Sequence, residues 1–393
     1  MARTFAAQRR RGALVIGGDY VGLGVVRSLG RRGIPVWVLD DEVPISLASR
    51  YTRKKLPWPR DERAQVDYLL SVCSRYDLDA WLLYPTRDET AAVIARHHDV
   101  LAERYTLTTA PWASLQYAYD KRLTYQLAAQ LGIPHPKTLH GIDPGDRRQL
   151  DLDFPVILKP AIKHLFYNQT RDKAWRVDSR AELVARYRAA SAIIDPAQIL
   201  IQELVPGRGH TQYSFGGLCW EGEVLASVVA RRLRQHPMDF GHASTFVETV
   251  EAPQVEAAAR RWLAALRYSG VVEIEFKYDA RTDEYKLLDV NPRFWGWHTL
   301  AARAGVDFPY LQWRLATQQP VKPRCARPGV RWVRMVTDLP TAAGEIVQGK
   351  LRVGTYLHSL APPVQFSVLA CDDPAPALFE LLLLPYLFKQ RGF

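Results

Sequence analysis

The sequence predicts a small parallel α/β domain at the N-terminus, followed by an α+β region built from antiparallel hairpins. Over the first hundred residues, apolar runs typical of buried strands alternate with segments of helical periodicity. Farther along the chain, strand-like runs follow one another across short polar turns, which is typical of hairpins. The 393 residues are enough for about two or three domains, each with its own core.

The first elements form a β-α-β unit. A strand is expected at residues 13–16, a helix over 21–29 and a second strand at 36–40. A helix over 64–76 then precedes an apolar strand at 80–84. This spacing predicts parallel strands, whose carboxyl ends place functional loops at one edge of the sheet.

The middle of the chain has the pattern of an α+β fold. Its predicted elements are a helix that ends at 131, a strand at 155–159, a helix over 180–190 and a strand at 199–203. The clearest hairpin joins strands at 271–278 and 284–290 across the polar turn 279–283. Prolines between 320 and 328 predict a linker into a last segment that ends in a helix.

The net charge of the chain indicates which classes of partner it favours, but it does not choose among them. The chain has 52 Lys and Arg against 41 Asp and Glu, which gives a net charge of +11. This excess favours anionic partners, namely phosphates, carboxylates, nucleic acid or an anionic membrane surface. The sequence contains no nucleic-acid recognition motif, so nucleic acid is not an expected partner.

Cysteines and apolar runs indicate a cytoplasmic chain with no transmembrane segment. Four widely separated cysteines disfavour a disulfide framework or a structural zinc site: Cys73, Cys219, Cys325 and Cys371. The longest apolar stretch, 381–388, is well short of the roughly 20 residues of a membrane-spanning helix. We therefore expect a packed helix at the C-terminus.

A glycine-rich turn follows the first predicted strand. Gly17, Gly18, Gly22 and Gly24 lie where a phosphate could bind a helix N-terminus. The dinucleotide-binding pattern also needs glycine at position 27, which is Arg27, and the turn lacks the lysine of a P-loop. We interpret these glycines as a tight scaffold turn, which disfavours a nicotinamide-dependent oxidoreductase.

The hairpin at 271–293 carries the strongest chemical signal. Asp289 and Asn291 are two residues apart on one strand, so they share a face, and Glu275 on the partner strand can join them. Burying carboxylates without compensation is costly, whereas Mg²⁺ prefers oxygen ligands of this kind together with phosphate oxygens. The sequence therefore predicts a metal site at Glu275, Asp289 and Asn291.

Basic residues suited to phosphate binding lie elsewhere in the chain. Lys159 ends an apolar strand and precedes a proline, which aims its ammonium out of the strand end. Together with Lys121 it could clamp a triphosphate. A further cluster, Arg231, Arg232 and Arg234, could neutralise an anionic intermediate, although a charged edge strand would have the same composition.

In their order along the chain, these residues resemble the ATP-grasp superfamily, and within it the carboxylate–amine ligases similar to D-aspartate ligase. The resemblance rests on YPTRD at 84–88, DK at 120–121, LGIPHP at 131–136, ILKP at 157–160, IQELVPG at 201–207, RRLRQHP at 231–237, EIEF at 273–276 and LDVNPR at 288–293. It implies an ATP-grasp fold with an N-terminal Rossmann-like pre-ATP-grasp domain. The implied domains are 1–112 (pre-ATP-grasp), 113–200 (small lobe), 201–320 (large lobe with the metal site) and 321–393 (C-terminal extension).

The resemblance also implies a role for each matching residue, with ATP and Mg²⁺ as cofactors. Lys121 and Lys159 would hold the ATP phosphates, and Glu275, Asp289 and Asn291 would hold magnesium. The strand meeting adenine would consist of Gln202, Glu203, Leu204 and Val205. The residues stabilising the transferred phosphoryl group and the acyl phosphate would be Arg293 with one or more of Arg231, Arg232 and Arg234.

The implied reaction joins a carboxylate to an amine, and an amino acid is the expected carboxylate substrate. ATP would phosphorylate the carboxylate, and the amine would then displace phosphate from the acyl phosphate to form an amide. Two alternatives remain open: loading of an amino acid onto the thiol of an acidic carrier protein, and nucleotide binding without turnover. Segment 163–173 lacks the glycines that many family members place in a loop over the phosphates.

Overall fold

The computed structural model describes residues 11–146, 151–170, 172–207, 209–236 and 243–391, which form two compact units. The N-terminal unit consists of Met1–Thr109, Pro309–Val321 and Val368–Phe393, and the central unit consists of Ala110–Phe308 and Lys322–Ser367. Two late segments therefore belong to the N-terminal unit, which the sequence did not suggest. The domain boundaries after residues 112, 200 and 320 remain predictions.

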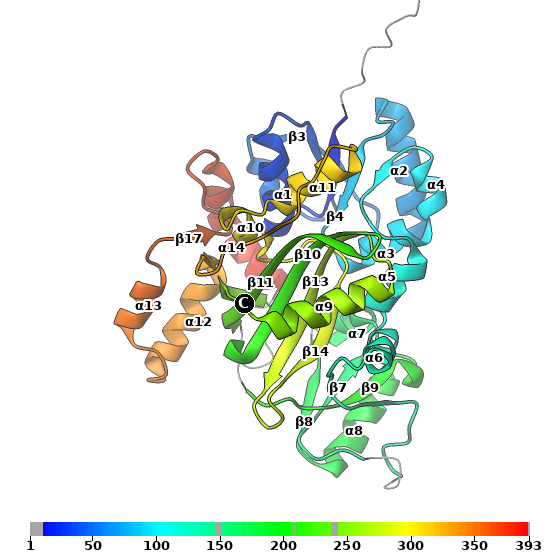
Figure 1. The fold of residues 1–393 in the computed structure, drawn as a ribbon, viewed down its shortest axis with the longest axis vertical. Helices are drawn as coiled ribbons and strands as arrows, with labels where there is room; N and C mark the ends of the chain where they lie inside the picture. The colour runs from blue at the N-terminus through cyan, green and yellow to red at the C-terminus, as the bar shows by residue number, and fades with distance from the viewer. Residues whose placement is uncertain (1–10, 147–150, 171, 208, 237–242, 392–393) are drawn as a thin grey trace, which may run out of the picture. The chain divides into compact units, whose positions relative to one another are not determined.

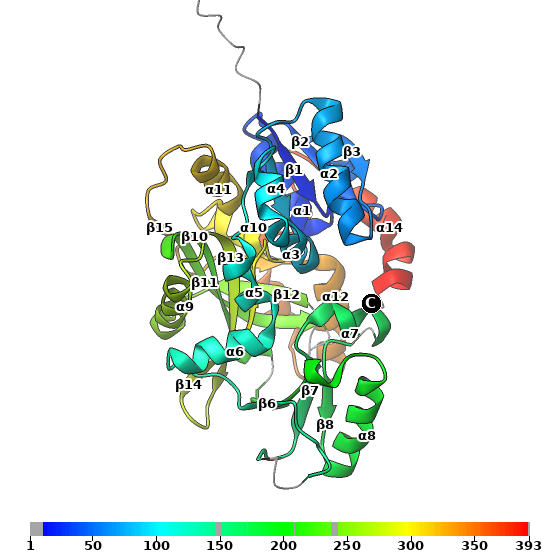
Figure 2. The same ribbon diagram turned by 90° about the vertical axis from the view of Figure 1, so that its right-hand side faces the viewer.

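The N-terminal unit contains a five-stranded parallel sheet with the strand order β3-β2-β1-β4-β5. Figure 2 labels its first three strands, β1, β2 and β3. Its strands are β1 (Ala13–Ile16), β2 (Val36–Asp40), β3 (Thr52–Pro57), β4 (Leu82–Pro85) and β5 (Thr106–Leu107). Its first helices are α1 (Tyr20–Gly30), α2 (Glu62–Tyr76), α3 (Asp88–Arg96) and α4 (His98–Ala102). The predicted parallel α/β domain is confirmed, although the strand expected at 80–84 begins two residues later.

The glycine-rich turn between β1 and α1 has a packing role. Gly17 has a φ of +96°, in the left-handed region that favours glycine. A Cβ atom on Gly22 would lie 2.0 Å from the carbonyl oxygen of Gly17, so only glycine lets α1 approach the turn so closely. This geometry supports the interpretation of the turn as scaffold.

The end of the chain packs into the N-terminal unit. Asp373 is 1% exposed and accepts hydrogen bonds from Arg27 Nε (2.9 Å), Ser49 Oγ (2.7 Å) and the Arg50 amide (3.0 Å). Helix α14 (Ala375–Arg391) follows directly, so the predicted C-terminal helix is present. The expected packing is only partial: Leu383 packs on the N-terminal unit, whereas Leu381 and Leu382 are 57% and 78% exposed. Within the described ranges, the structure has no helix that is both long and apolar enough to span a membrane.

The central unit contains an eight-stranded sheet with the order β14-β13-β10-β11-β12-β16-β17, in which β15 also pairs with β11. Its strands are β10 (Gln212–Trp220), β11 (Glu223–His236), β12 (Ala243–Thr249), β13 (Gly270–Asp279), β14 (Glu284–Asn291), β15 (Arg324–Cys325), β16 (Arg331–Val333) and β17 (Val364–Phe366).

Helix α9 (Pro253–Ala265) packs across β10 and β11 (Figure 1). The other helices of this unit are α5 (Trp112–Tyr119), α6 (Lys121–Gln130), α7 (Lys163–Thr170), α8 (Arg180–Ser191), α10 (His298–Arg303), α12 (Met335–Val347) and α13 (Val353–Ser359). Helix α11 (Phe308–Ala316) begins at the last residue of this unit's first segment.

A second, four-stranded sheet of the central unit has the order β6-β9-β7-β8. Its strands are β6 (Thr138–His140), β7 (Val156–Pro160), β8 (Trp175–Val177) and β9 (Ile199–Glu203). One face packs on α8 (Figure 2) through a core that includes Val156, Leu158, Leu183, Ile199 and Ile201. Because side chains alternate along a strand, Lys159 and Gln202 project from the opposite face.

Segment 163–173, which lacks the glycines of a phosphate-covering loop, is largely helical. Residues Lys163–Thr170 form α7, directly after β7. The helix agrees with the absence of glycine from this stretch, because glycine is unfavourable in a helix interior.

Candidate active site

The hairpin of β13 and β14 assembles a polar cluster on one face of the large sheet. Glu275 lies opposite Asp289 in the register, and Glu273 lies opposite Asn291. Because residues two apart on a strand share a face, all four side chains project from the same side. The predicted hairpin is therefore confirmed, together with the shared face expected for Glu275, Asp289 and Asn291.

Each carboxylate of the predicted metal set has a cationic neighbour. Asp289 Oδ1 accepts a hydrogen bond from Lys121 Nζ at 2.7 Å. Burial alone would raise the pKa of Asp289, but the charge and hydrogen bond of Lys121 hold it below its ordinary value. Glu275 Oε2 lies 2.5 Å from Gln212 Nε2 and 3.4 Å from an Arg232 nitrogen. Lys121 of α6 and Asp289 of β14 are thus in direct contact.

Glu273 belongs to this cluster although the sequence analysis did not select it. Its carboxylate is 4% exposed and accepts hydrogen bonds from Trp297 Nε1 (2.9 Å) and Asn291 Nδ2 (3.1 Å). Burial and the nearby charge of Glu275 raise its pKa to about 7. The two-residue spacing from Glu275 was the signal that could have identified it.

Two lysines approach the cluster from the small sheet and its neighbouring segment. Lys159 Nζ donates to Tyr125 Oη at 2.8 Å, and burial and the charge of Lys121 lower its pKa to about 7. Burial, with the charge of Lys163, also lowers the pKa of Lys173 to about 7, against the opposing effects of Glu275 and Asp289. Lys173 is therefore a further cation beside the hairpin, and its position after α7 gave no sequence signal.

The predicted adenine-contacting segment begins in β9 and continues past it. Gln202 is 1% exposed, and its side-chain amide donates to Thr138 Oγ1 at 2.7 Å. Glu203 Oε1 accepts from Lys286 Nζ at 2.9 Å, which ties β9 to the hairpin that carries the acidic cluster. Leu204 is half-buried and Val205 is buried just after the strand ends.

The four predicted arginines divide into two groups. Arg293 donates to Asn291 Oδ1 at 3.0 Å and Arg232 lies beside Glu275, so both are at the cluster. Arg231 is adjacent to Arg232 on β11, so its side chain projects from the other face of the sheet. There it lies opposite Glu248 of β12. Arg234 makes a buried two-point ion pair with Asp338 of α12, at 2.8 and 2.9 Å.

The structure therefore does not bring Arg231 and Arg234 to the site. The physical reason differs between the two arginines. Adjacent residues of a strand point to opposite faces, which separates Arg231 from Arg232. Register shifts on both sides of Arg234 rotate β11 locally and direct this side chain to Asp338.

Because Arg234 stabilises the fold, its loss is expected to reduce stability. Arg234→Met would leave the fully buried Asp338 carboxylate without its guanidinium, at a cost of about 3–5 kcal/mol in the free energy of unfolding. Urea denaturation measures this change. Arg260→Met, which breaks an exposed pair with Glu256, is the control and should cost about 1 kcal/mol or less. Equal losses in the two variants would contradict the structural role of Arg234.

The donor set of the hairpin fits Mg²⁺. Among the described residues, no three His, Cys, Asp or Glu side chains converge closely enough to enclose a metal ion. Mg²⁺, however, is usually bound by one or two carboxylates together with water and substrate phosphates. Glu275, Asp289 and Asn291 present oxygen atoms from one sheet face, which is the chemistry that such a shared site needs.

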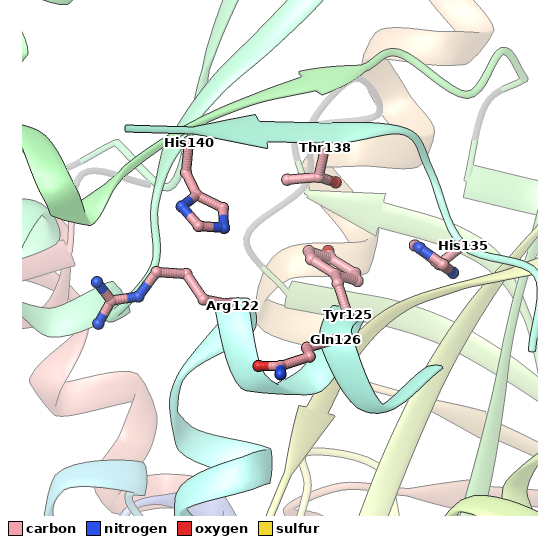
Figure 3. A pocket seen from close by; sticks show the side chains of 6 residues that line it. All are labelled: Arg122, Tyr125, Gln126, His135, Thr138 and His140. Carbon is pink, nitrogen blue, oxygen red and sulfur yellow. The ribbon is translucent and has the colours of Figure 1, made fainter. Parts of the chain in front are cut away.

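A pocket of about 440 Å³ lies between α6 and β6 (Figure 3). Its lining residues are Arg122, Tyr125, Gln126, His135, Thr138 and His140. It adjoins the site through Tyr125, whose hydroxyl bonds Lys159, and through Thr138, which bonds Gln202. The tyrosine thus lies between the pocket and Lys159.

Comparison of sequences relates this chain to ligases. The model of a family described as ATP-grasp in the biosynthetic pathway with Ter operon matches residues 195–338. A D-aspartate ligase from Enterococcus faecium is 23% identical over 226 residues, which cover 54% of this chain and 53% of that protein. The similarity thus spans about half the length of this curated relative.

Solved structures show the fold. An L-amino acid ligase from Bacillus licheniformis has a TM-score of 0.62 at 15% identity, over 81% of this chain and 78% of that chain. A biotin carboxylase from Campylobacter jejuni has a TM-score of 0.61 at 14% identity, over 77% and 70%. An N5-carboxyaminoimidazole ribonucleotide synthetase from Thermus thermophilus has a TM-score of 0.59 at 17% identity, over 81% of each chain.

Proposed function

The chain has the ATP-grasp fold, and from this premise we propose that it is an ATP-dependent carboxylate–amine ligase that forms an amide bond. One observation carries the proposal. The acidic face of the β13–β14 hairpin lies against Lys121 and Arg293, and Lys121 bonds Asp289 directly. A site that brings ATP and a carboxylate together needs this combination, because fixed cations must offset the repulsion between anions.

The side chains have distinct proposed roles. Lys121 and Lys159, joined by Lys173, bind the ATP phosphates, while the segment from Gln202 to Val205 contacts adenine. Mg²⁺ held by Glu275, Asp289 and Asn291 would neutralise phosphate charge. Arg293 and Arg232 stabilise the negative charge of the transferred phosphoryl group.

The proposed reaction has two chemical steps. A carboxylate oxygen attacks the γ-phosphorus of ATP, which forms an acyl phosphate and releases ADP. The amine nitrogen then attacks the carbonyl carbon, phosphate leaves with the electron pair of the broken C–O bond, and the amine loses a proton. No side-chain nucleophile is required, so the protein contributes binding, orientation and charge stabilisation.

We propose an amino acid as the carboxylate substrate and the cytoplasm as the location. The substrate class is supported by the names of two similar proteins, D-aspartate ligase and L-amino acid ligase. The location is supported by the four widely separated cysteines of the sequence.

A substrate panel tests the function directly. The purified protein with Mg²⁺ and ATP is incubated with amino acids as carboxylates and with a series of amines, and ADP and phosphate release are measured. Mass spectrometry should identify an amide product, and hydroxylamine in place of the amine should trap the acyl phosphate as a hydroxamate. ADP release only with an acyl-carrier thiol would favour the carrier-loading alternative. ATP binding without ADP release for any pair would contradict the ligase proposal.

A further inference from the structure

Tyr125 occupies a connecting position between the two sheets of the central unit. It lies in α6, and Figure 3 shows its ring projecting from this helix toward the strand that carries Thr138. Its hydroxyl lies 2.8 Å from Lys159 Nζ in β7 and 2.7 Å from the carbonyl oxygen of Leu288 in β14. Leu288 directly precedes Asp289, so one hydroxyl joins the small-sheet lysine to the strand of the acidic cluster.

Chemistry fixes the direction of both hydrogen bonds. The Leu288 carbonyl oxygen has only acceptor sites, so the single hydroxyl proton of Tyr125 is donated to it. The Tyr125 oxygen therefore accepts from an N–H of Lys159. Burial raises the pKa of Tyr125 above its ordinary value, so the hydroxyl keeps its proton at neutral pH.

Lys159 depends on this hydroxyl for its position. Within the described part of the chain, the Tyr125 hydroxyl is the one hydrogen-bond partner of the Lys159 ammonium. Burial and the positive charge of Lys121 both disfavour the charged form of Lys159. A flexible four-carbon side chain in this setting needs a fixed acceptor to keep its remaining N–H groups directed at one place.

We propose that Tyr125 is a positioning residue, whose hydroxyl holds the ammonium of Lys159 beside β14 in the orientation that binds ATP phosphate. The inference rests on the proposed function, because it assumes that Lys159 binds a phosphate of ATP. It concerns the hydroxyl alone. The ring packs parallel to His135 at 5.8 Å and lies 5.2 Å from Lys159 Nζ, and phenylalanine would keep both contacts.

Tyr125→Phe isolates the contribution of the hydroxyl. Isothermal titration with Mg²⁺-ATP should show affinity reduced about tenfold, the size expected for losing a hydrogen bond to a charged group. The affinity for adenosine, which has no phosphate, should stay unchanged. The matched control is Tyr268→Phe, which removes a buried tyrosine hydroxyl bonded to the Val271 carbonyl oxygen at 3.1 Å. The control should retain wild-type affinity for both ligands.

A double-mutant cycle distinguishes positioning from general packing. Lys159→Met should weaken ATP binding, and adding Tyr125→Phe to it should cause no further loss, because the hydroxyl acts through the ammonium. Additive losses, or an equal loss of ATP and adenosine affinity in Tyr125→Phe, would overturn the inference. So would wild-type ATP affinity in Tyr125→Phe. Failure of the wild-type protein to bind Mg²⁺-ATP would instead overturn the proposed function.

Discussion

Asp289→Asn is expected to reduce the rate of ADP release by at least about 1,000-fold, since it removes a carboxylate proposed to hold the phosphate-bound metal ion. Asparagine keeps the size of the side chain and can still accept the hydrogen bond from Lys121. The fold should therefore survive with a modest loss of thermal stability. A coupled assay for ADP, run beside thermal denaturation, measures both effects.

The control for Asp289→Asn is Glu248→Gln. Glu248 lies opposite Arg231 on the other face of the same sheet and pairs with Arg331 at 3.2 Å. This change also neutralises one carboxylate of the sheet, and it should leave ADP release within about twofold of wild type. Near-wild-type ADP release in Asp289→Asn would remove the hairpin from the active site.

Arg293→Lys should lower kcat by roughly 100-fold while Mg²⁺-ATP still binds. The guanidinium bonds both Asn291 Oδ1 (3.0 Å) and the Phe294 carbonyl oxygen (3.1 Å), which holds its plane beside the acidic cluster. Lysine keeps the charge but lacks the planar fork that can be anchored and still contact phosphoryl oxygens. An interaction made mainly in the transition state affects kcat rather than nucleotide affinity.

Steady-state kinetics and nucleotide titration check this prediction together. Arg260→Lys, on the exposed surface of α9, is the control and should leave kcat unchanged. A normal kcat in Arg293→Lys would contradict the proposed role of Arg293. A loss of ATP affinity as large as the loss of rate would also contradict it, since Arg293 would then bind ATP in the ground state.

The acidic hairpin could be predicted from the sequence because its signal is local. Asp289 and Asn291 interrupt one apolar strand at two-residue spacing, and a short turn brings Glu275 of the other strand beside them. The same rule extends to Glu273. Gln212 and Lys173 give no local signal, because each reaches the hairpin from a distant segment through tertiary folding.

Arg234 and β3 show where local patterns mislead. Arg234 resembles its neighbours in a basic run, but its buried partner Asp338 is 104 positions away in the sequence. Strand β3 contains Arg53, Lys54 and Lys55 and has no apolar run, because it is an edge strand with one open side. The partner of Arg234 and the edge position of β3 both depend on the tertiary structure, and the local sequence composition does not reveal either of them.

The ion pair between Arg27 and Asp373 has a consequence for biosynthesis. The two residues are 346 positions apart, so at least that length of chain must be synthesised after Arg27 before this buried guanidinium can meet its carboxylate. The N-terminal sheet can form early, because its strands are close in sequence. Its packing becomes complete only after Val368 and Leu383 have been translated, and until then the apolar surface of Leu23 and Ile45 that they cover stays exposed.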